Sequence, residues 1–195
     1  MLETYEWPTN GRAAIEGQGT CVGATFDRGQ PRLGWKTDEC ETLIRCVNTC
    51  FRHILDQHGI AFHWASLQIN KNSVSRRHTD RNNEGASLIV LFGNFTKGAF
   101  RMADGSLELQ HTGEILTIDG TQPHESEEFE GERFSIVAFY HSSTASLHTN
   151  HQERLRDMGF CLAHQSIPVS PKEEDRILIE LCCGPNSQLS QTTSH

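Results

Sequence analysis

The chain has 195 residues, of which 36% are hydrophobic and 22% charged, and its formal net charge is −8. We find no signal peptide and no hydrophobic span, and the seven cysteines lack a regular disulfide spacing, which excludes a membrane-embedded or disulfide-stapled secreted protein. One soluble domain with a sizeable core, in a reducing intracellular compartment, is therefore expected. The acidic balance argues mildly against a dedicated nucleic-acid-binding domain, which is usually basic.

The first 37 residues are rich in glycine and polar side chains. They predict irregular or short-strand structure that lies against the rest of the domain. Three large aromatic residues are scattered through this part of the chain, and we interpret them as packing anchors: Trp7, Phe26 and Trp35.

Residues 38–58 predict an amphipathic helix, since apolar residues recur there at helical spacing. Asp38 suits the N-cap, and Gly59 suits the C-terminal end. A zinc site on this helix is an alternative use of three of its residues, Cys46, Cys50 and His53. Because no Cys-x-x-Cys pair accompanies them, we interpret the cysteines as small apolar residues facing the core.

Short apolar segments separated by turns follow the helix and predict a mostly β domain, with the helix packed on one face of its sheet. The predicted strands are residues 60–70, 87–92, 98–102, 106–109, 114–118 and 133–141. Residues 98–102 and 106–109 flank the turn Ala103-Asp104-Gly105 and are predicted to form a hairpin. The polar residues 80–85 form a turn, which we expect at the mouth of the site.

His78 and Asp80 lie two residues apart, so on an extended strand they point to the same side and can converge on one ion. A third ligand must come from elsewhere, and His124 is the best-placed candidate. His111 is its rival, but it lies at an expected strand end two residues before Gly113. Two histidines and a carboxylate form the facial triad of non-haem Fe(II) oxygenases, although zinc accepts the same ligands with a water.

Arg133 follows His124 by nine residues and shares one strand face with Ser135. A guanidinium with a neighbouring hydroxyl is a good receptor for a carboxylate. A metal at one end and this pair at the other suit a dicarboxylic keto acid. His141 and Phe139 have the same parity as Arg133, so they could also reach the pocket.

Together these residues resemble the Fe(II)/2-oxoglutarate-dependent dioxygenases, over roughly residues 64–142. The resemblance implies a double-stranded β-helix, or jelly-roll, fold. It also implies that His78, Asp80 and His124 bind Fe(II), that Arg133 binds the far carboxylate of 2-oxoglutarate, and that Ser135 assists. Asn70 is a weaker candidate beside the co-substrate. Oxygen would be the second co-substrate, and ascorbate a supporting reductant.

Within this superfamily, the overall sequence of residues 67–81 and 113–142 looks most like the TET/JBP branch, which oxidises 5-methyl groups of pyrimidines in nucleic acid. That resemblance implies 5-methylcytosine or thymine in DNA as the substrate and a nuclear location. Four cations cluster around His-x-Asp, either for phosphates or as a solvated rim: Lys71, Arg76, Arg77 and Arg81. An acidic run over residues 125–132 should then lie away from the phosphates. The alternatives are a small metabolite or protein side chain as substrate, or a metal-binding jelly roll without turnover.

The composition changes after residue 142, so we predict a dioxygenase domain over residues 1–142, with its barrel core over 60–142. Residues 143–195 would hold a linker, a short helix over 152–159 and a C-terminal extension. The apolar residues 176–181 before Gly184 resemble the opening of a methyltransferase-like domain, with a barrel edge strand or a disordered tail as the alternatives. The sequence does not indicate an oligomeric state.

Overall fold

The computed structural model describes residues 2–3, 5–11, 14–27 and 29–162. Its strands are β1 (Ile15–Asp27), β2 (Gln30–Leu33), β3 (Ser66–Ser75), β4 (Ser87–Lys97), β5 (Phe100–Met102), β6 (Glu108–Leu109), β7 (Ile115–Ile118), β8 (His124–Ser126) and β9 (Phe129–Phe139). Its helices are α1 (Glu41–Gln57), the short 3-10 helix Thr144–Ser146 and α2 (Thr149–Asp157). The strands pair in the orders β2-β1-β3-β9-β4-β7 and β6-β5-β8, and every pairing is antiparallel.

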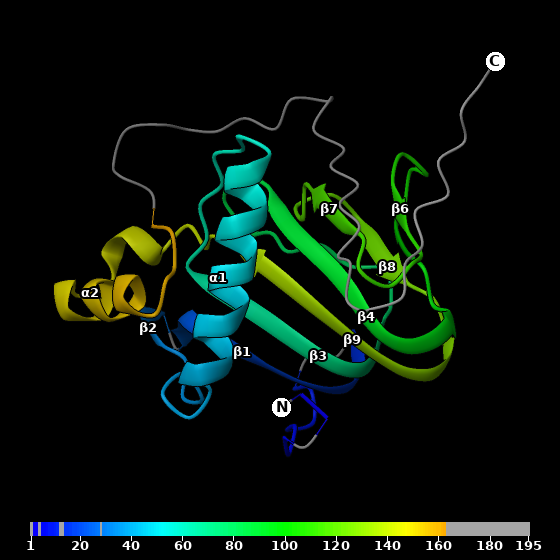
Figure 1. The fold of residues 1–195 in the computed structure, drawn as a ribbon, viewed down its shortest axis with the longest axis horizontal. Helices are drawn as coiled ribbons and strands as arrows, with labels where there is room; N and C mark the ends of the chain where they lie inside the picture. Colours follow the sequence, from blue (N-terminus) through cyan, green and yellow to red (C-terminus); the bar gives the residue numbers. More distant parts are fainter. Residues whose placement is uncertain (1, 4, 12–13, 28, 163–195) are drawn as a thin grey trace.

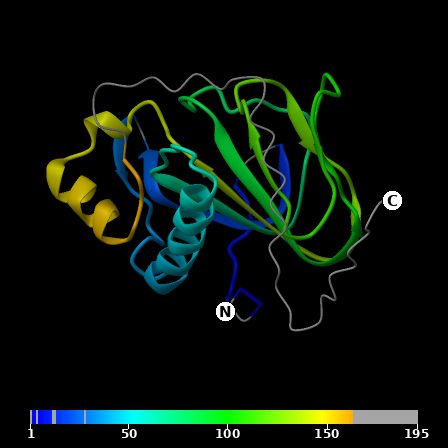
Figure 2. The ribbon, with the colours of Figure 1, turned by 45° about the horizontal axis from the view of Figure 1, so that its top comes forward.

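The large sheet lies between helix α1 on one face and the smaller sheet on the other (Figures 1 and 2). Side chains alternate along each strand, so one face takes every second residue. Leu67 and Ile69 of β3 face the α1 side and join its apolar core. Gln68 and Asn70 point the other way, into a cavity that the smaller sheet closes. The alternation of β3 thus separates a dry layer under α1 from a polar interior.

The fold prediction is confirmed: the domain is mostly β, with two facing antiparallel sheets arranged as a jelly roll and helices at its flank. Two apolar clusters hold it together. One lies between α1 and the large sheet. The other lies inside the barrel, where Ile89 and Leu91 of β4 meet Phe100 and Met102 of β5. No helix in the described part of the chain is long and apolar enough to cross a membrane.

Helix α1 forms where predicted but begins at Glu41, three residues after Asp38, and no side chain in the described part of the chain caps it. It buries a row of apolar residues against the sheet, Leu43, Ile44, Phe51, Ile54 and Leu55. Each contributes about 1.5–3 kcal/mol through the apolar surface it removes from water. The interpretation of Cys46 and Cys50 as core residues was wrong, because both are exposed. Among the described residues, neither belongs to a group of three ligands close enough for a metal.

The N-terminal region departs most from the sequence-based expectation. β1 is a long strand that pairs with β2 on one side and with β3 on the other. Its glycines and polar residues hide the alternation, but β3 pairs with its residues 15–23 and β2 with its residues 24–27, and such pairing overrides weak propensity. Trp7 is buried, as predicted. Phe26 and Trp35 are exposed, so their interpretation as packing anchors was wrong.

Strand boundaries also moved. β3 begins at Ser66 and continues to Ser75, and β9 begins at Phe129, within the acidic run. Each extension lies where a neighbouring strand or residue offers main-chain partners. Three glutamates of the run are neutralised by cations on other strands, in the ion pairs Arg101–Glu127, Lys97–Glu130 and Lys71–Glu132. The run is therefore divided between the end of β8 and the start of β9.

Helix α2 packs into the main core, with Leu155 and Met158 buried in the same cluster as Trp64. A buried amide ties the two helices together. Asn48 of α1 accepts a hydrogen bond from Trp64 Nε1 at 2.8 Å and donates one to the carbonyl of Met158 at 2.9 Å. The methyltransferase-like hypothesis concerns residues outside the described ones and stays a prediction.

Candidate functional site

The segment after β3 crosses to the smaller sheet and pairs with the start of β8. His78 and His124 exchange two main-chain hydrogen bonds, each of 3.0 Å. Two residues later, the N–H of Asp80 donates to the carbonyl of Gly120 at 2.8 Å. His78 and Asp80 consequently sit on an extended segment with a fixed register, and their side chains point to one side, as the two-residue spacing predicted.

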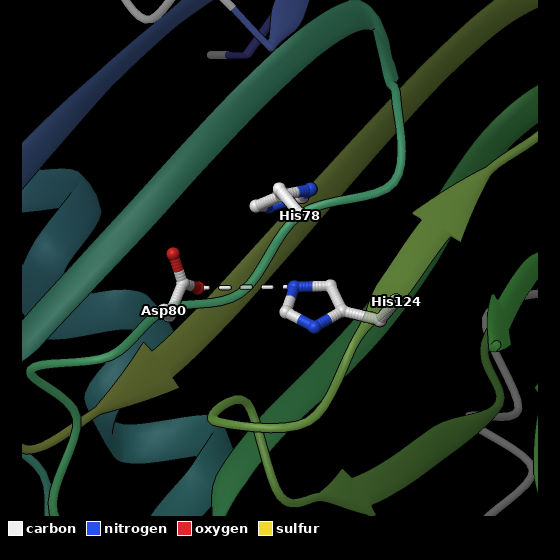
Figure 3. Close-up of side chains that lie close together, drawn as sticks. All are labelled: His78, Asp80 and His124. Carbon is white, nitrogen blue, oxygen red and sulfur yellow. Dashed lines mark ion pairs between the residues drawn. The ribbon is translucent and has the colours of Figure 1, made fainter. Parts of the chain in front are cut away.

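This pairing brings the three predicted ligands together (Figure 3). The ligand atoms of His78, Asp80 and His124 all lie within 4.8 Å of one another, the one such group among the described residues. His124 Nε2 is 3.9 Å from Asp80 Oδ2, and the two imidazole rings are 4.3 Å apart between centroids. His111, the rival, is exposed in the turn before β7 and lies outside this group.

Main-chain carbonyls fix the tautomer of both imidazoles. His78 Nδ1 lies 2.7 Å from the carbonyl of Arg76, and His124 Nδ1 lies 2.8 Å from that of Gln122. A carbonyl only accepts hydrogen bonds, so each Nδ1 carries the proton and each Nε2 keeps its lone pair for a metal. Burial lowers the pKa of His124, which also favours the neutral, ligating form.

Arg133 is a buried cation in the same pocket, with 3% of its surface exposed. Its Nη1 donates to the carbonyl of Ser73 at 3.0 Å, while its Nε has no hydrogen-bond partner among the described residues. Within the described part of the chain, no carboxylate forms an ion pair with it. Burial lowers the pKa of Arg133 to about 10, so the guanidinium stays charged at neutral pH. A buried charge of this kind is costly unless an anion joins it.

A backbone kink positions Arg133. Asn72 adopts a left-handed φ of 49°, which Asn tolerates better than most residues, and its Oδ1 accepts the main-chain N–H of Arg133 at 2.9 Å. Gly17 lies opposite, where a Cβ would come within 2.3 Å of the Asn72 carbonyl oxygen. The rings of Phe95 and Phe129 flank the guanidinium at 5.8 and 5.6 Å.

Ser135 and Asn70 belong to a chain of side-chain hydrogen bonds beside Arg133. Gln68 Nε2 donates to Asn70 Oδ1 at 2.9 Å, and Asn70 Nδ2 donates to Ser135 Oγ at 3.0 Å. Asn10 Nδ2 joins the same network directly, donating to Asn70 Oδ1 at 3.5 Å, and it also donates to Ser73 Oγ at 3.2 Å. Asn70 and Ser135 were predicted from the sequence as site residues, whereas Gln68 and Asn72 were not. The shared parity of Gln68 and Asn70 could have identified the former, whereas Asn72 depends on a kink with no local signal.

Two adjoining hollows give the site its shape. The inner one, ≈ 80 Å³, contains the three candidate ligands together with Arg133 and Ser135. The outer one, ≈ 560 Å³, shares His78 and Asp80 with it and is lined further by Phe26 and His141. The ring of His141 stacks on Phe26, at 5.4 Å between centroids and 19° between planes. Burial lowers the pKa of His141, so this ring is neutral at neutral pH.

The cations around His-x-Asp divide into two kinds. Lys71 pairs with Glu132 and Arg76 pairs with Glu16, so these four charges cancel. Arg77 and Arg81 are exposed and form no ion pair with the other described residues. Arg81 lines the outer hollow.

No protein-family model and no curated protein matches this chain. Solved structures similar to it include an oxidoreductase of the 2OG-Fe(II) oxygenase family from Burkholderia pseudomallei, at 22% identity and a TM-score of 0.49 over 70% of this chain and 72% of that one. OsALKBH1 is similar at 10% identity and 0.42 over 69% and 84%. YcfD, a ribosomal oxygenase from Escherichia coli in complex with cobalt and 2-oxoglutarate, is similar at 13% and 0.38 over 85% and 52%. Likenesses of this size are loose, and the chemistry of the site follows from its own side chains.

Replacing His78 or His124 by alanine should weaken Fe(II) binding by more than about 100-fold, because even changes to residues behind the ligands cost 10–100-fold. Anaerobic calorimetric titration with Fe(II) measures this directly. His111→Ala is the matched control and should bind as the wild type does. Equal losses in all three variants would show that the cluster is not the metal site.

Proposed function

We propose that this protein is an Fe(II)/2-oxoglutarate-dependent dioxygenase that hydroxylates an unactivated C–H bond. The observation that carries the proposal is the burial of the Arg133 guanidinium beside the three candidate ligands. A buried guanidinium without a carboxylate partner among the described residues lines the same small cavity as the two imidazoles and the carboxylate. A co-substrate with a metal-chelating group at one end and a carboxylate at the other would satisfy both halves of this cavity.

His78, Asp80 and His124 fit Fe(II) as its ligands. Two imidazoles with free Nε2 atoms and one carboxylate are the donor set of non-haem iron oxygenases. When bound, the iron would supply the oxygen activation by which substrate, 2-oxoglutarate and O₂ give hydroxylated substrate, succinate and carbon dioxide. Zinc with a water would fit the same three ligands. A zinc hydrolase, however, would not need a buried guanidinium that can bind a ligand carboxylate beside the metal.

The remaining pocket residues bind and orient. Arg133 and the Ser135 hydroxyl would hold the far carboxylate of 2-oxoglutarate, and Asn70 would keep that hydroxyl oriented through its 3.0 Å hydrogen bond. Ile89, Phe100 and Val137 line the same cavity and exclude water from it. Exclusion of water strengthens each charged contact in the cavity.

For the substrate we propose the 5-methyl group of a pyrimidine in DNA, as in 5-methylcytosine or thymine. The outer hollow adjoins the candidate iron ligands and offers a flat, neutral His141 ring beside Phe139. An extruded base could stack there, which is how enzymes that modify bases reach them. Arg81, without an ion-pair partner in the described chain, could meet a phosphate at the rim.

The charge distribution is compatible with this substrate despite the net charge of −8. Glu130 and Glu132 lie at the start of β9, while His141 follows its other end. A strand rises about 3.3 Å per residue, so these carboxylates are roughly 23 to 30 Å from Phe139, where β9 reaches the outer hollow. Repulsion of phosphates over that distance is largely screened at physiological salt.

Succinate formation tests the proposed activity. Purified protein with Fe(II), 2-oxoglutarate and ascorbate should form succinate in step with oxidised bases when DNA containing 5-methylcytosine is added, with both products read by mass spectrometry. DNA without methylated cytosine is a control for that base, and thymine oxidation must be read in both. Succinate without base oxidation would redirect the substrate to a metabolite or a protein side chain. No succinate from iron-loaded protein would favour a binding protein.

Arg133→Ala should raise the KM for 2-oxoglutarate roughly thirtyfold, because a hydrogen bond to a charged group contributes about 2 kcal/mol. Fe(II) affinity should stay near the wild-type value, since no ligand is removed. Lys97→Ala, which removes an exposed cation at the far end of β4, is the matched control. An unchanged KM in Arg133→Ala would refute the receptor assignment.

A further inference from the structure

Two large apolar side chains are exposed in the described part of the chain, Phe26 at 47% and Trp35 at 71%. A single exposed apolar residue needs no explanation. These two, however, line one hollow of ≈ 310 Å³ beside β1, whose wall also includes Gln68 of β3. A solvent-filled hollow with two exposed aromatic side chains in its wall is suited to a flat, partly apolar guest.

This hollow, the flanking hollow, adjoins the outer hollow of the active site. Phe26 lines both, and so do Cys21 and Thr25 of the same strand. On the active-site side, Phe26 stacks on His141. On the other side it belongs to the same wall as Trp35. Phe26 is therefore a divider between a space that reaches the candidate iron ligands and a space that does not.

A cation lies against the ring of Trp35. Lys36 Nζ lies 4.7 Å from the centroid of the indole, and the ammonium is itself paired with Glu39. A cation over one part of the ring leaves a large exposed aromatic surface for a guest. The charged side chains that line the flanking hollow, Asp27 and Arg32, pair with each other at 2.9 Å. The hollow itself therefore carries no net charge that would repel an anionic chain.

We propose that the flanking hollow binds the base next to the pyrimidine that is modified, and that this base stacks on Trp35. This inference rests on the proposed function. A chain that places one base beside His141 and the next beside Trp35, with Phe26 between them, must have both bases unstacked from each other. The preferred substrate is therefore an unpaired or locally opened strand, since stacking of successive bases on aromatic side chains is how proteins bind single strands.

Tryptophan fluorescence tests this without turnover. Of the three tryptophans, Trp7 and Trp64 are 6% and 1% exposed, so Trp35 provides the solvent-accessible emission. Titration with a mixed-sequence single-stranded DNA oligonucleotide should quench that emission. Trp35→Ala should weaken binding, followed by anisotropy of a labelled oligonucleotide, by about tenfold, whereas Trp35→Phe should keep most of the affinity. A duplex of the same sequence should bind more weakly than the single strand.

A charge pair of variants checks the strand's path. Arg81→Gln should reduce the salt dependence of oligonucleotide binding by about one phosphate contact, whereas Lys97→Gln should leave it unchanged. Trp35→Ala with wild-type affinity, or a duplex that binds as tightly as the single strand, would overturn the proposal. Oligonucleotide binding without succinate formation would support the flanking hollow as a base-binding site and contradict the proposed dioxygenase activity. Succinate formation without quenching would support the dioxygenase activity and contradict the base-binding site.

Discussion

The reciprocal main-chain hydrogen bonds between His78 and His124 are the constraint on which the site depends. They join two segments that are 46 positions apart and fix their register. Without that register, the two imidazoles and Asp80 would not face one another. A slip of one residue would turn His78 and Asp80 to the opposite side of the strand. The same pairing places His124 in the barrel interior, where burial keeps its ring neutral. Local sheet geometry thus sets the chemistry of the ligands.

The second constraint is the charge of Arg133. Its neighbours are a main-chain carbonyl and two aromatic rings, which orient the guanidinium without neutralising it. The folded domain carries this cost at a place where apolar packing was available, since Phe100 and Val137 line the same cavity. Such a cost is typical of a site that is completed by a ligand. Burial of the Arg133 charge therefore lowers the stability of the folded domain until an anion binds.

Much of the site could be predicted because its residues obey strand alternation. His78 with Asp80, and Arg133 with Ser135, follow a two-residue period, and a period does not depend on knowing the partner strand. The N-terminal region could not be predicted in this way. β1 forms because it pairs with β3. The kink at Asn72 requires a residue without a side chain opposite it, which is Gly17. The exposure of Phe26 and Trp35 is a property of the assembled surface, and no local pattern encodes it.

We infer that the three ligands and Arg133 form the two ends of one co-substrate site. Anaerobic calorimetry of the Fe(II)-loaded protein with 2-oxoglutarate and with pyruvate tests it most directly, because pyruvate keeps the chelating end and lacks the far carboxylate. We expect 2-oxoglutarate to bind at least tenfold more tightly than pyruvate, and removal of the metal to weaken the binding of both acids. Equal affinities for the two acids, or 2-oxoglutarate binding that is indifferent to the metal, would contradict it.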